Sequence, residues 1–196
     1  MEAKKRIAVL VSGGGTNLQA IIDAQKSGII KSGEVVLVLS NNEKAYALER
    51  AENAGIKTLT IKRGADTEAQ ILQAMQDEKI DLIVLAGFMT VLSEEFTRKF
   101  PRRILNVHPS LIPSFCGKGY YGLKVHEEAL KKGVKVTGAT VHFVNEIPDG
   151  GEIIFQKAVD VEEDDTPQTL QRRVMEQAEW ILLPRAIEKV CSEMSE

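Results

Sequence analysis

Short apolar runs alternate with segments of helical period along the chain up to residue 108, and this alternation restricts the possible folds. The run "RIAVLV" (residues 6–11) is almost wholly apolar and is followed by glycines. The next segment, "NLQAIIDAQKSG", places Leu18, Ile21 and Ile22 on one face of a helix. The pattern recurs until "RILNVH" (residues 103–108). Such alternation predicts a parallel sheet that is covered by helices on both faces.

The pattern changes in the last third of the chain. The strand-like segments "KVTGATVHFVN" and "GEIIFQKAVDV" are separated only by "EIPDG", which predicts an antiparallel hairpin at the edge of the sheet. A long helical segment closes the chain. We therefore expect residues 1–196 to form a single α/β domain with a Rossmann-like, doubly wound, mostly parallel sheet, a C-terminal antiparallel hairpin and a closing C-terminal helix.

Helix boundaries can be predicted from capping residues. Thr67 with Gln70 three residues later has the pattern of a capping box. Thr166 suits the N-cap of the closing helix, and Pro167 suits its first turn. Pro184 lies inside this helical segment and should kink or restart the helix.

Composition narrows the class of function. The 196 residues are 43% hydrophobic and 27% charged, and the net charge is −3. The lack of a basic cluster argues against a nucleic-acid partner, and no run approaches the length of a membrane span. The N-terminal apolar run is too short for a signal peptide, and the two cysteines form neither a disulfide framework nor a metal-ligand spacing. We expect a cytoplasmic protein with no bound metal.

The loop "VSGGGTNLQ" follows the first predicted strand. Gly13 to Gly15 would let the backbone approach an anion closely, and Thr16 or Asn17 could cap the following helix. A dinucleotide fingerprint would need glycine where Leu18 stands and an acidic residue near positions 40–42, and the lysine of a Walker loop is missing. A single phosphate monoester therefore fits better than NAD or ATP, and the alternative is a glycine turn that binds no ligand.

Asn106 and His108 lie two residues apart on a predicted strand, so their side chains leave the same face. Pro109 favours an extended backbone at His108, at the carboxyl end of an inner strand where ligands bind in such sheets. A catalytic imidazole and an ordinary strand end are both compatible with this pattern.

Four further residues have side chains that could act at the same site. His142 is a second candidate, although a histidine hydrogen-bonded within a strand is an equal alternative. His126 lies among charged residues on a predicted helix, which predicts that it is solvated. Asp149 in "NEIPDGGE" has the pattern of a hairpin turn, but beside a histidine it could stabilise an imidazolium. Cys116 is a poor candidate nucleophile, because nothing near it in the sequence would lower its pKa.

Five motifs then occur in the order and spacing of one enzyme family. They are "VSGGGTNLQAIIDA", "LAGFMTVLS", "ILNVHPSLIPSF", "GATVHFV" and "PDGGEII". Through these motifs the chain resembles phosphoribosylglycinamide formyltransferase over essentially its whole length. The resemblance implies transfer of a formyl group from 10-formyltetrahydrofolate, as co-substrate, to the amine of glycinamide ribonucleotide in de novo purine biosynthesis. It implies small-molecule partners only, with no nucleic acid, membrane or metal, and it leaves the oligomeric state open.

The resemblance also assigns roles to residues, with residues 1–100 expected to bind the ribotide phosphate and residues 101–196 expected to hold the catalytic and folate-binding groups. The implied catalytic residues are Asn106, His108 and Asp149. The implied ribotide-binding residues are Gly15, Thr16, Asn17 and Glu179, the last of which would otherwise pass for a helix-surface charge. The implied folate-binding residues are Met89, Thr90, Val91, Leu92, Asn145, Glu146, Ile147 and Pro148.

This sequence departs from the family pattern at two places. Thr90 stands where some relatives have arginine, and the loop 114–122 looks longer than in others. In the implied mechanism, Asn106 and a protonated His108 stabilise the oxyanion, while Asp149 holds the imidazolium and helps to move a proton. The alternatives are 10-formyltetrahydrofolate hydrolase, a family with an additional N-terminal regulatory domain, and a catalytically silent nucleotide-binding module.

Overall fold

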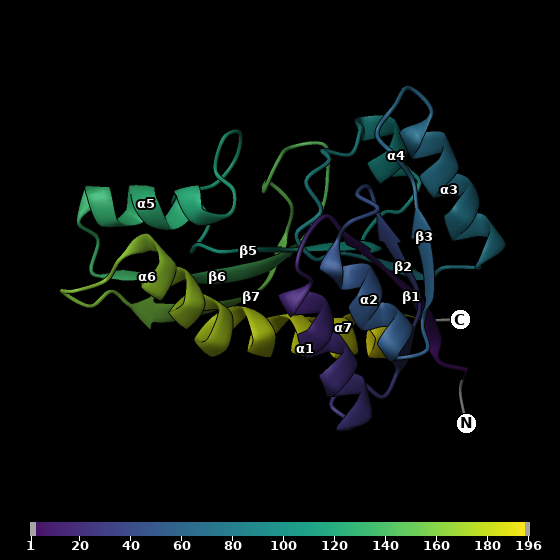
Figure 1. Ribbon diagram of the computed structural model, residues 1–196, viewed down its shortest axis with the longest axis horizontal. Helices are drawn as coiled ribbons and strands as arrows, with labels where there is room; N and C mark the ends of the chain where they lie inside the picture. Colours follow the sequence, from purple (N-terminus) through teal and green to yellow (C-terminus); the bar gives the residue numbers. More distant parts are fainter. Residues whose placement is uncertain (1–2, 195–196) are drawn as a thin grey trace.

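The computed structural model describes residues 3–194. Within these residues, seven strands form one sheet in the order β3-β2-β1-β4-β5-β6-β7 (Figure 1). The strands are β1 (Lys5–Val11), β2 (Gly33–Ser40), β3 (Lys57–Thr60), β4 (Leu82–Leu85), β5 (Ile104–His108), β6 (Val136–Phe143) and β7 (Ile153–Asp160). The first five are parallel, and β6 and β7 are antiparallel to their neighbours. The predicted α/β fold with a C-terminal hairpin is confirmed.

Helices cover both faces of the sheet, as the alternating pattern predicts. They are α1 (Thr16–Lys26), α2 (Tyr46–Asn53), α3 (Thr67–Asp77), α4 (Glu94–Arg98), α5 (Leu123–Lys132), α6 (Pro167–Val174), the π-helical segment η1 (Met175–Glu179) and α7 (Trp180–Glu193). In Figure 1, α3 and α4 lie on one side of the sheet, and α1, α6 and α7 lie on the other.

The core has two layers because successive strand residues face opposite sides of the sheet. Ile7, Val9 and Val11 of β1 join a cluster with the buried faces of α1, α2, α6 and α7. Ala8 and Leu10 join a second cluster with the buried faces of α3 and α4. Both faces of β1 are thus buried, which explains why its sequence is apolar without alternation.

The strand order places a topological switch beside β1. The chain continues from β1 to β2 and β3 on one side, and then crosses to β4 and β5 on the other. The loops after β1 and β4 therefore diverge at the carboxyl edge of the sheet, which is where ligands bind in open α/β sheets.

The C-terminal helical region agrees with part of its prediction. Thr166 caps α6 within a capping box, and Pro167 occupies the first turn. Pro184 lies inside α7, and its missing N–H removes the usual partner of the Trp180 carbonyl. Helix α7 nevertheless continues as one helix through this proline, so the helix does not restart there.

The capping box predicted at Thr67 is wrong. Asp66 is the N-cap of α3 and makes no side-chain cap bond. The Thr67 hydroxyl instead accepts a hydrogen bond from the Gly64 N–H at 2.7 Å, because the loop before the helix folds back onto it.

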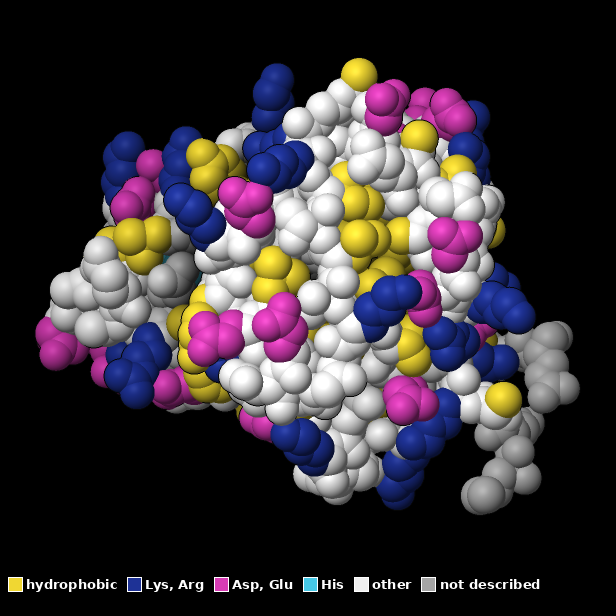
Figure 2. Space-filling model, turned by 45° about the vertical axis from the view of Figure 1, so that its right-hand side comes forward, with side chains coloured by type: hydrophobic (Ala, Val, Ile, Leu, Met, Phe, Trp, Pro, Cys, Tyr) yellow, Lys and Arg dark blue, Asp and Glu magenta, His cyan; other side chains and the backbone are white. Residues whose placement is uncertain are grey.

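The surface carries charges of both signs. On the face shown in Figure 2, Lys and Arg side chains are interspersed with Asp and Glu, and a group of hydrophobic side chains lies near the centre. None of the helices described for residues 3–194 is both long enough and apolar enough to cross a membrane.

Candidate active site

The glycine loop after β1 leads directly into α1. Gly15 is the N-cap, in the left-handed region with φ of 71°, and no side chain caps the helix. Thr16 and Asn17 therefore lie in the first turn, and the expectation that one of them caps the helix is wrong. First-turn N–H groups have no acceptor within their own helix, so this end of α1 can receive an anion.

Glu179 lies beside this turn, although 162 positions separate it from Asn17. The Asn17 side-chain amide donates to Glu179 Oε2 at 2.7 Å. Glu179 is only 6% exposed, so the sequence-based view of it as a surface charge is wrong. Burial raises the pKa of Glu179 to about 7, although the bond from Asn17 acts in the opposite direction.

Asn106, His108 and Asp149 come together at the carboxyl end of β5. Asp149 Oδ2 lies 3.5 Å from His108 Nδ1, and Asp149 Oδ1 lies 3.4 Å from the Asn106 side-chain nitrogen. Asp149 has a φ of 56°, which is uncommon for a residue other than glycine and suggests local strain. The Gly117 N–H donates to Asp149 Oδ2 at 2.8 Å, so the loop after β5 helps to hold the carboxylate.

His142 is a fourth member of this cluster. It pairs with Asn106 across the antiparallel β5–β6 register, and its Nε2 lies 3.2 Å from the Asn106 nitrogen and 3.6 Å from Asp149 Oδ1. The sequence leaves the role of His142 undecided, because its position beside Asn106 depends on the register between β5 and β6.

The hydrogen bonds define which ring nitrogens carry protons. His142 Nδ1 lies 2.7 Å from the Phe143 carbonyl, which can only accept, so Nδ1 carries a proton and Nε2 accepts from Asn106. By the same reasoning, His108 Nε2 donates to the Phe115 carbonyl at 2.8 Å. Neutral His108 therefore presents the lone pair of Nδ1 to Asp149.

Burial and neighbouring charges set the protonation of His108 and Asp149 near neutral pH. Burial lowers the pKa of His108, although the charge of Asp149 and the Phe115 carbonyl act in the opposite direction. Burial alone would raise the pKa of Asp149, but the two histidines and the Gly117 N–H outweigh it and the net pKa is lowered. At pH 7 the structure thus favours a neutral His108 beside an ionised Asp149, a pair that can accept one proton.

The formyl transferase family profile matches residues 5–187.

The chain belongs to the formyl transferase family.

Two relatives and one solved structure illustrate the similarity. The chain is 43% identical over 194 residues to the human trifunctional purine biosynthetic protein adenosine-3, covering 96% of this chain but only 18% of that protein. It is 42% identical over 188 residues to Haemophilus influenzae phosphoribosylglycinamide formyltransferase, covering 93% of this chain and 85% of that protein. The crystal structure of phosphoribosylglycinamide formyltransferase from Anaplasma phagocytophilum superposes with a TM-score of 0.89 at 36% identity, covering 97% of this chain and 89% of that chain.

The stretch from Met89 to Leu92 follows β4 and is fixed by neighbouring loops. The Met89 N–H donates to Ser12 Oγ at 2.9 Å, which ties this stretch to the glycine loop. The Asn41 amide donates to Thr90 Oγ1 at 2.9 Å. Val91 is 76% exposed, whereas Leu92 is buried in the core on the α3 side.

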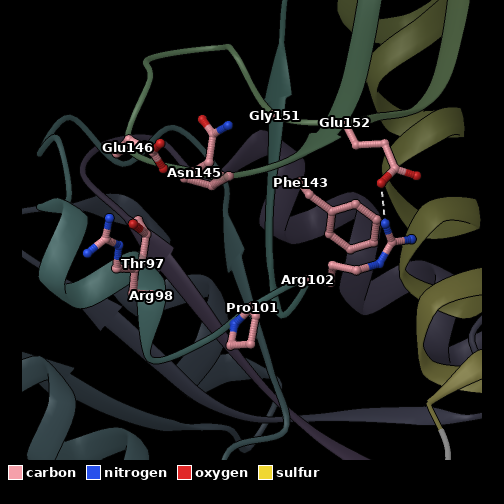
Figure 3. A pocket seen from close by; sticks show the side chains of 10 residues that line it. Thr97, Arg98, Pro101, Arg102, Phe143, Asn145, Glu146, Gly151 and Glu152 are labelled. Carbon is pink, nitrogen blue, oxygen red and sulfur yellow. Dashed lines mark hydrogen bonds and ion pairs between the residues drawn. The ribbon is translucent and has the colours of Figure 1, made fainter.

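The loop between β6 and β7 contains the other implied folate-binding residues, Asn145 to Pro148. The Asn145 side chain accepts from the Ile147 N–H at 3.0 Å, and Ile147 is exposed. Asn145 and Glu146 also line a cavity of about 260 Å³ between this loop and the end of α4. Figure 3 shows Arg98 and Arg102 on the opposite side of this cavity, with Arg102 paired to Glu152.

His126 does not match its prediction. It is fully buried, and burial lowers its pKa to about 4. Neither of its ring nitrogens has a partner within residues 3–194. The buried set Val125, His126 and Ala129 follows the helical period of α5, and this signal could have predicted its burial.

The loop after β5 contains Cys116 and the Ile112–Pro113 peptide bond. Burial and the charge of Asp149 raise the pKa of Cys116, which makes its thiol a poorer nucleophile at pH 7. The Ile112–Pro113 peptide bond, left open by the sequence, is cis. The Thr140 hydroxyl donates to the Ser110 carbonyl at 2.7 Å and anchors the start of this loop to β6.

Proposed function

We propose that the chain transfers the formyl group of 10-formyltetrahydrofolate to the amine of glycinamide ribonucleotide, a step of de novo purine biosynthesis. The observation that carries the proposal is the cluster of Asn106, His108 and Asp149 at the same sheet edge as an open helix N-terminus. The names of the relatives in the formyl transferase family support the same reaction.

The ribotide phosphate would bind at the first turn of α1, to the N–H groups of Gly15, Thr16 and Asn17. Glu179 would bind the sugar part of the ribotide. Support comes from the buried Oδ1 of Asn17, which has no partner within residues 3–194 and leaves an acceptor unused beside Glu179.

The formyl folate would bind between the stretch Met89–Leu92 and the loop Asn145–Pro148. Both segments expose apolar side chains, namely those of Met89, Val91 and Ile147. An apolar ring system can pack on such side chains, and backbone groups of the two loops can bond its polar edge.

In the proposed mechanism, the substrate amine attacks the formyl carbon, and negative charge develops on the formyl oxygen. Asn106 can donate to this oxygen the N–H that lies near Asp149, at a long 3.4 Å, while the other remains on His142. His108, once protonated on Nδ1, can donate to the same oxygen while its Nε2–H stays on Phe115. The 3.5 Å between Nδ1 and Asp149 is long for a hydrogen bond and leaves Nδ1 available.

Asp149 would stabilise the imidazolium and help to move the proton from the attacking nitrogen to the leaving nitrogen of the folate. The carbon–nitrogen bond to the folate then breaks, and the oxyanion collapses to the new formamide. The residues of this chain account for these steps without a covalent enzyme intermediate.

One assay tests the proposal against its alternatives. Purified protein is mixed with 10-formyltetrahydrofolate, with and without glycinamide ribonucleotide, and folate deformylation is followed by absorbance. Turnover only with the ribotide would support the transferase. Turnover without it would identify the hydrolase, and no turnover in either mixture would favour a silent nucleotide-binding module.

A further inference from the structure

The glycine loop is held from one side by α2. The Ala47 N–H donates to the Gly13 carbonyl at 3.1 Å, and Arg50 Nε donates to the Gly14 carbonyl at 2.8 Å. A second nitrogen of Arg50 donates to the Gln19 side chain at 3.1 Å, so this guanidinium joins the loop to α1. Arg50 also lies over the Tyr46 ring, with 4.8 Å between Cζ and the ring centroid. Its position is therefore fixed by three contacts.

The contact between α2 and the loop is too close for a side chain at position 15. A Cβ on Gly15 would lie 2.6 Å from the Ala47 Cβ and 2.8 Å from its Cα. Ala47 is fully buried and cannot move away without disturbing the core. The loop is thus seated directly on α2.

These contacts orient the peptide groups of the loop. In a trans peptide the C=O and N–H point in opposite directions. Because the carbonyls of Gly13 and Gly14 point to α2, the N–H groups of Gly14 and Gly15 point away from it. Together with the open first turn of α1, they form a series of N–H groups of the kind that binds anions.

We propose that Arg50 is a positioning residue for the phosphate of the acceptor substrate. It acts by fixing the Gly14 carbonyl, so that the adjacent N–H groups face the phosphate, and by placing a positive charge beside a loop that lacks a lysine of its own. This inference rests on the proposed function, because it assumes that the acceptor carries a phosphate at this loop.

The test compares Arg50→Ala, Arg50→Lys and the wild-type protein with two acceptors, glycinamide ribonucleotide and the same compound without its phosphate. Arg185→Ala is the matched control, since this arginine stacks on Phe155 at 5.4 Å and lies outside the site. Far-UV circular dichroism verifies that each variant is folded.

We expect Arg50→Ala to raise the KM for the ribotide about tenfold, with kcat and the KM for the formyl folate unchanged within about twofold. The inhibition constant of inorganic phosphate should rise by the same factor. Arg50→Lys should show an intermediate KM, because lysine keeps the charge but cannot bond Gly14 and Gln19 together. With the dephosphorylated acceptor, Arg50→Ala and the wild-type protein should be equally active.

An unchanged KM for the ribotide in Arg50→Ala would overturn the inference. An equal loss with both acceptors would also overturn it, because it would indicate a general structural effect. If the wild-type protein turns over neither acceptor, the proposed function fails, and titration with inorganic phosphate still decides the role of Arg50. Equal phosphate affinity in the wild-type and Arg50→Ala proteins would then refute it.

Discussion

At the scale of single residues, Asn106 and His108 are the donors that the proposed mechanism assigns to the developing oxyanion. Loss of one such donor usually lowers the rate by about 10²–10³. We expect Asn106→Ala and His108→Ala to lose kcat by at least this factor, while Lys189→Ala at an exposed position of α7 keeps it. Steady-state kinetics provide the measurement, and near-normal kcat in either variant would contradict the assignment.

The buried carboxyl of Glu179 should make stability depend on pH. Burial raises its pKa in the folded protein from 4.5 to about 7, so the folded state holds its proton to a higher pH than the unfolded chain does. Its contribution is complete below pH 4.5 and is lost as pH rises through about 7. The loss should approach 3 kcal/mol, an order-of-magnitude figure of about 1.4 kcal/mol per pKa unit.

Glu179→Gln replaces the titratable carboxyl with an amide that does not change its charge with pH. We expect the free energy of unfolding in urea to fall between pH 5 and pH 8 in the wild-type protein, and to fall less in Glu179→Gln. Parallel pH profiles for the two proteins would show that Glu179 is not the group responsible.

The sequence allowed some of these residues to be located and not others. The shared face of Asn106 and His108 follows from strand geometry alone. Glu179 was assigned by family resemblance and otherwise looked solvent-exposed, because a helix shows which residues share a face but not which face the rest of the fold covers. His126 also looked solvent-exposed because its neighbours are charged, although the apolar period of α5 indicated the buried face. The burial of Glu179 depends on contacts with a segment distant in the sequence, such as its bond with Asn17.

At the scale of elements, the α6 cap offers a change that should affect stability alone. The Thr166 hydroxyl accepts from the Thr169 N–H at 3.2 Å. Loss of such a cap typically costs about 1 kcal/mol. Thr166→Ala should therefore lower the free energy of unfolding by about that amount, with kcat and KM unchanged. Chemical denaturation and steady-state kinetics test both parts, and a change in KM would show that the α6 terminus contributes to the site.

Helix caps also show where local patterns succeed. Thr166 was predicted correctly because its hydroxyl bonds to Thr169, in the first turn of the helix that it caps. At Thr67 the preceding loop takes the hydroxyl, and at α1 the left-handed Gly15 replaces a side-chain cap. Capping patterns describe a helix in isolation, so they fail where the flanking loop has its own tertiary contacts.

At the scale of the whole molecule, one continuous sheet crosses both sequence halves. Unfolding should therefore be a single transition. The only tryptophan, Trp180, begins α7, so its fluorescence reports on the C-terminal helical region. We expect its midpoint in urea to coincide with the midpoint measured by far-UV circular dichroism. Two separate midpoints would show that the halves unfold independently.

The sequence predicts the arrangement of strands and helices better than it predicts the contacts between side chains of the site. Alternating strands and helices restrict the chain to a doubly wound sheet, and the short "EIPDG" connection requires an antiparallel hairpin. The meeting of His142 with Asn106 depends on strand register, which this pattern does not determine.

The π-helical segment η1 has a consequence for insertions and deletions. Buried residues continue in steps of four through it, at Leu170, Val174, Ala178, Leu182, Ala186 and Val190. A regular α-helix turns about 100° per residue, so five such steps would carry the buried face about 200° around the axis. The wider turn of η1 offsets part of this rotation. Removal of one residue there would turn α7 by about 100° relative to α6, and would displace both the core face of α7 and Glu179. Changes in chain length should therefore be excluded from Met175–Glu179.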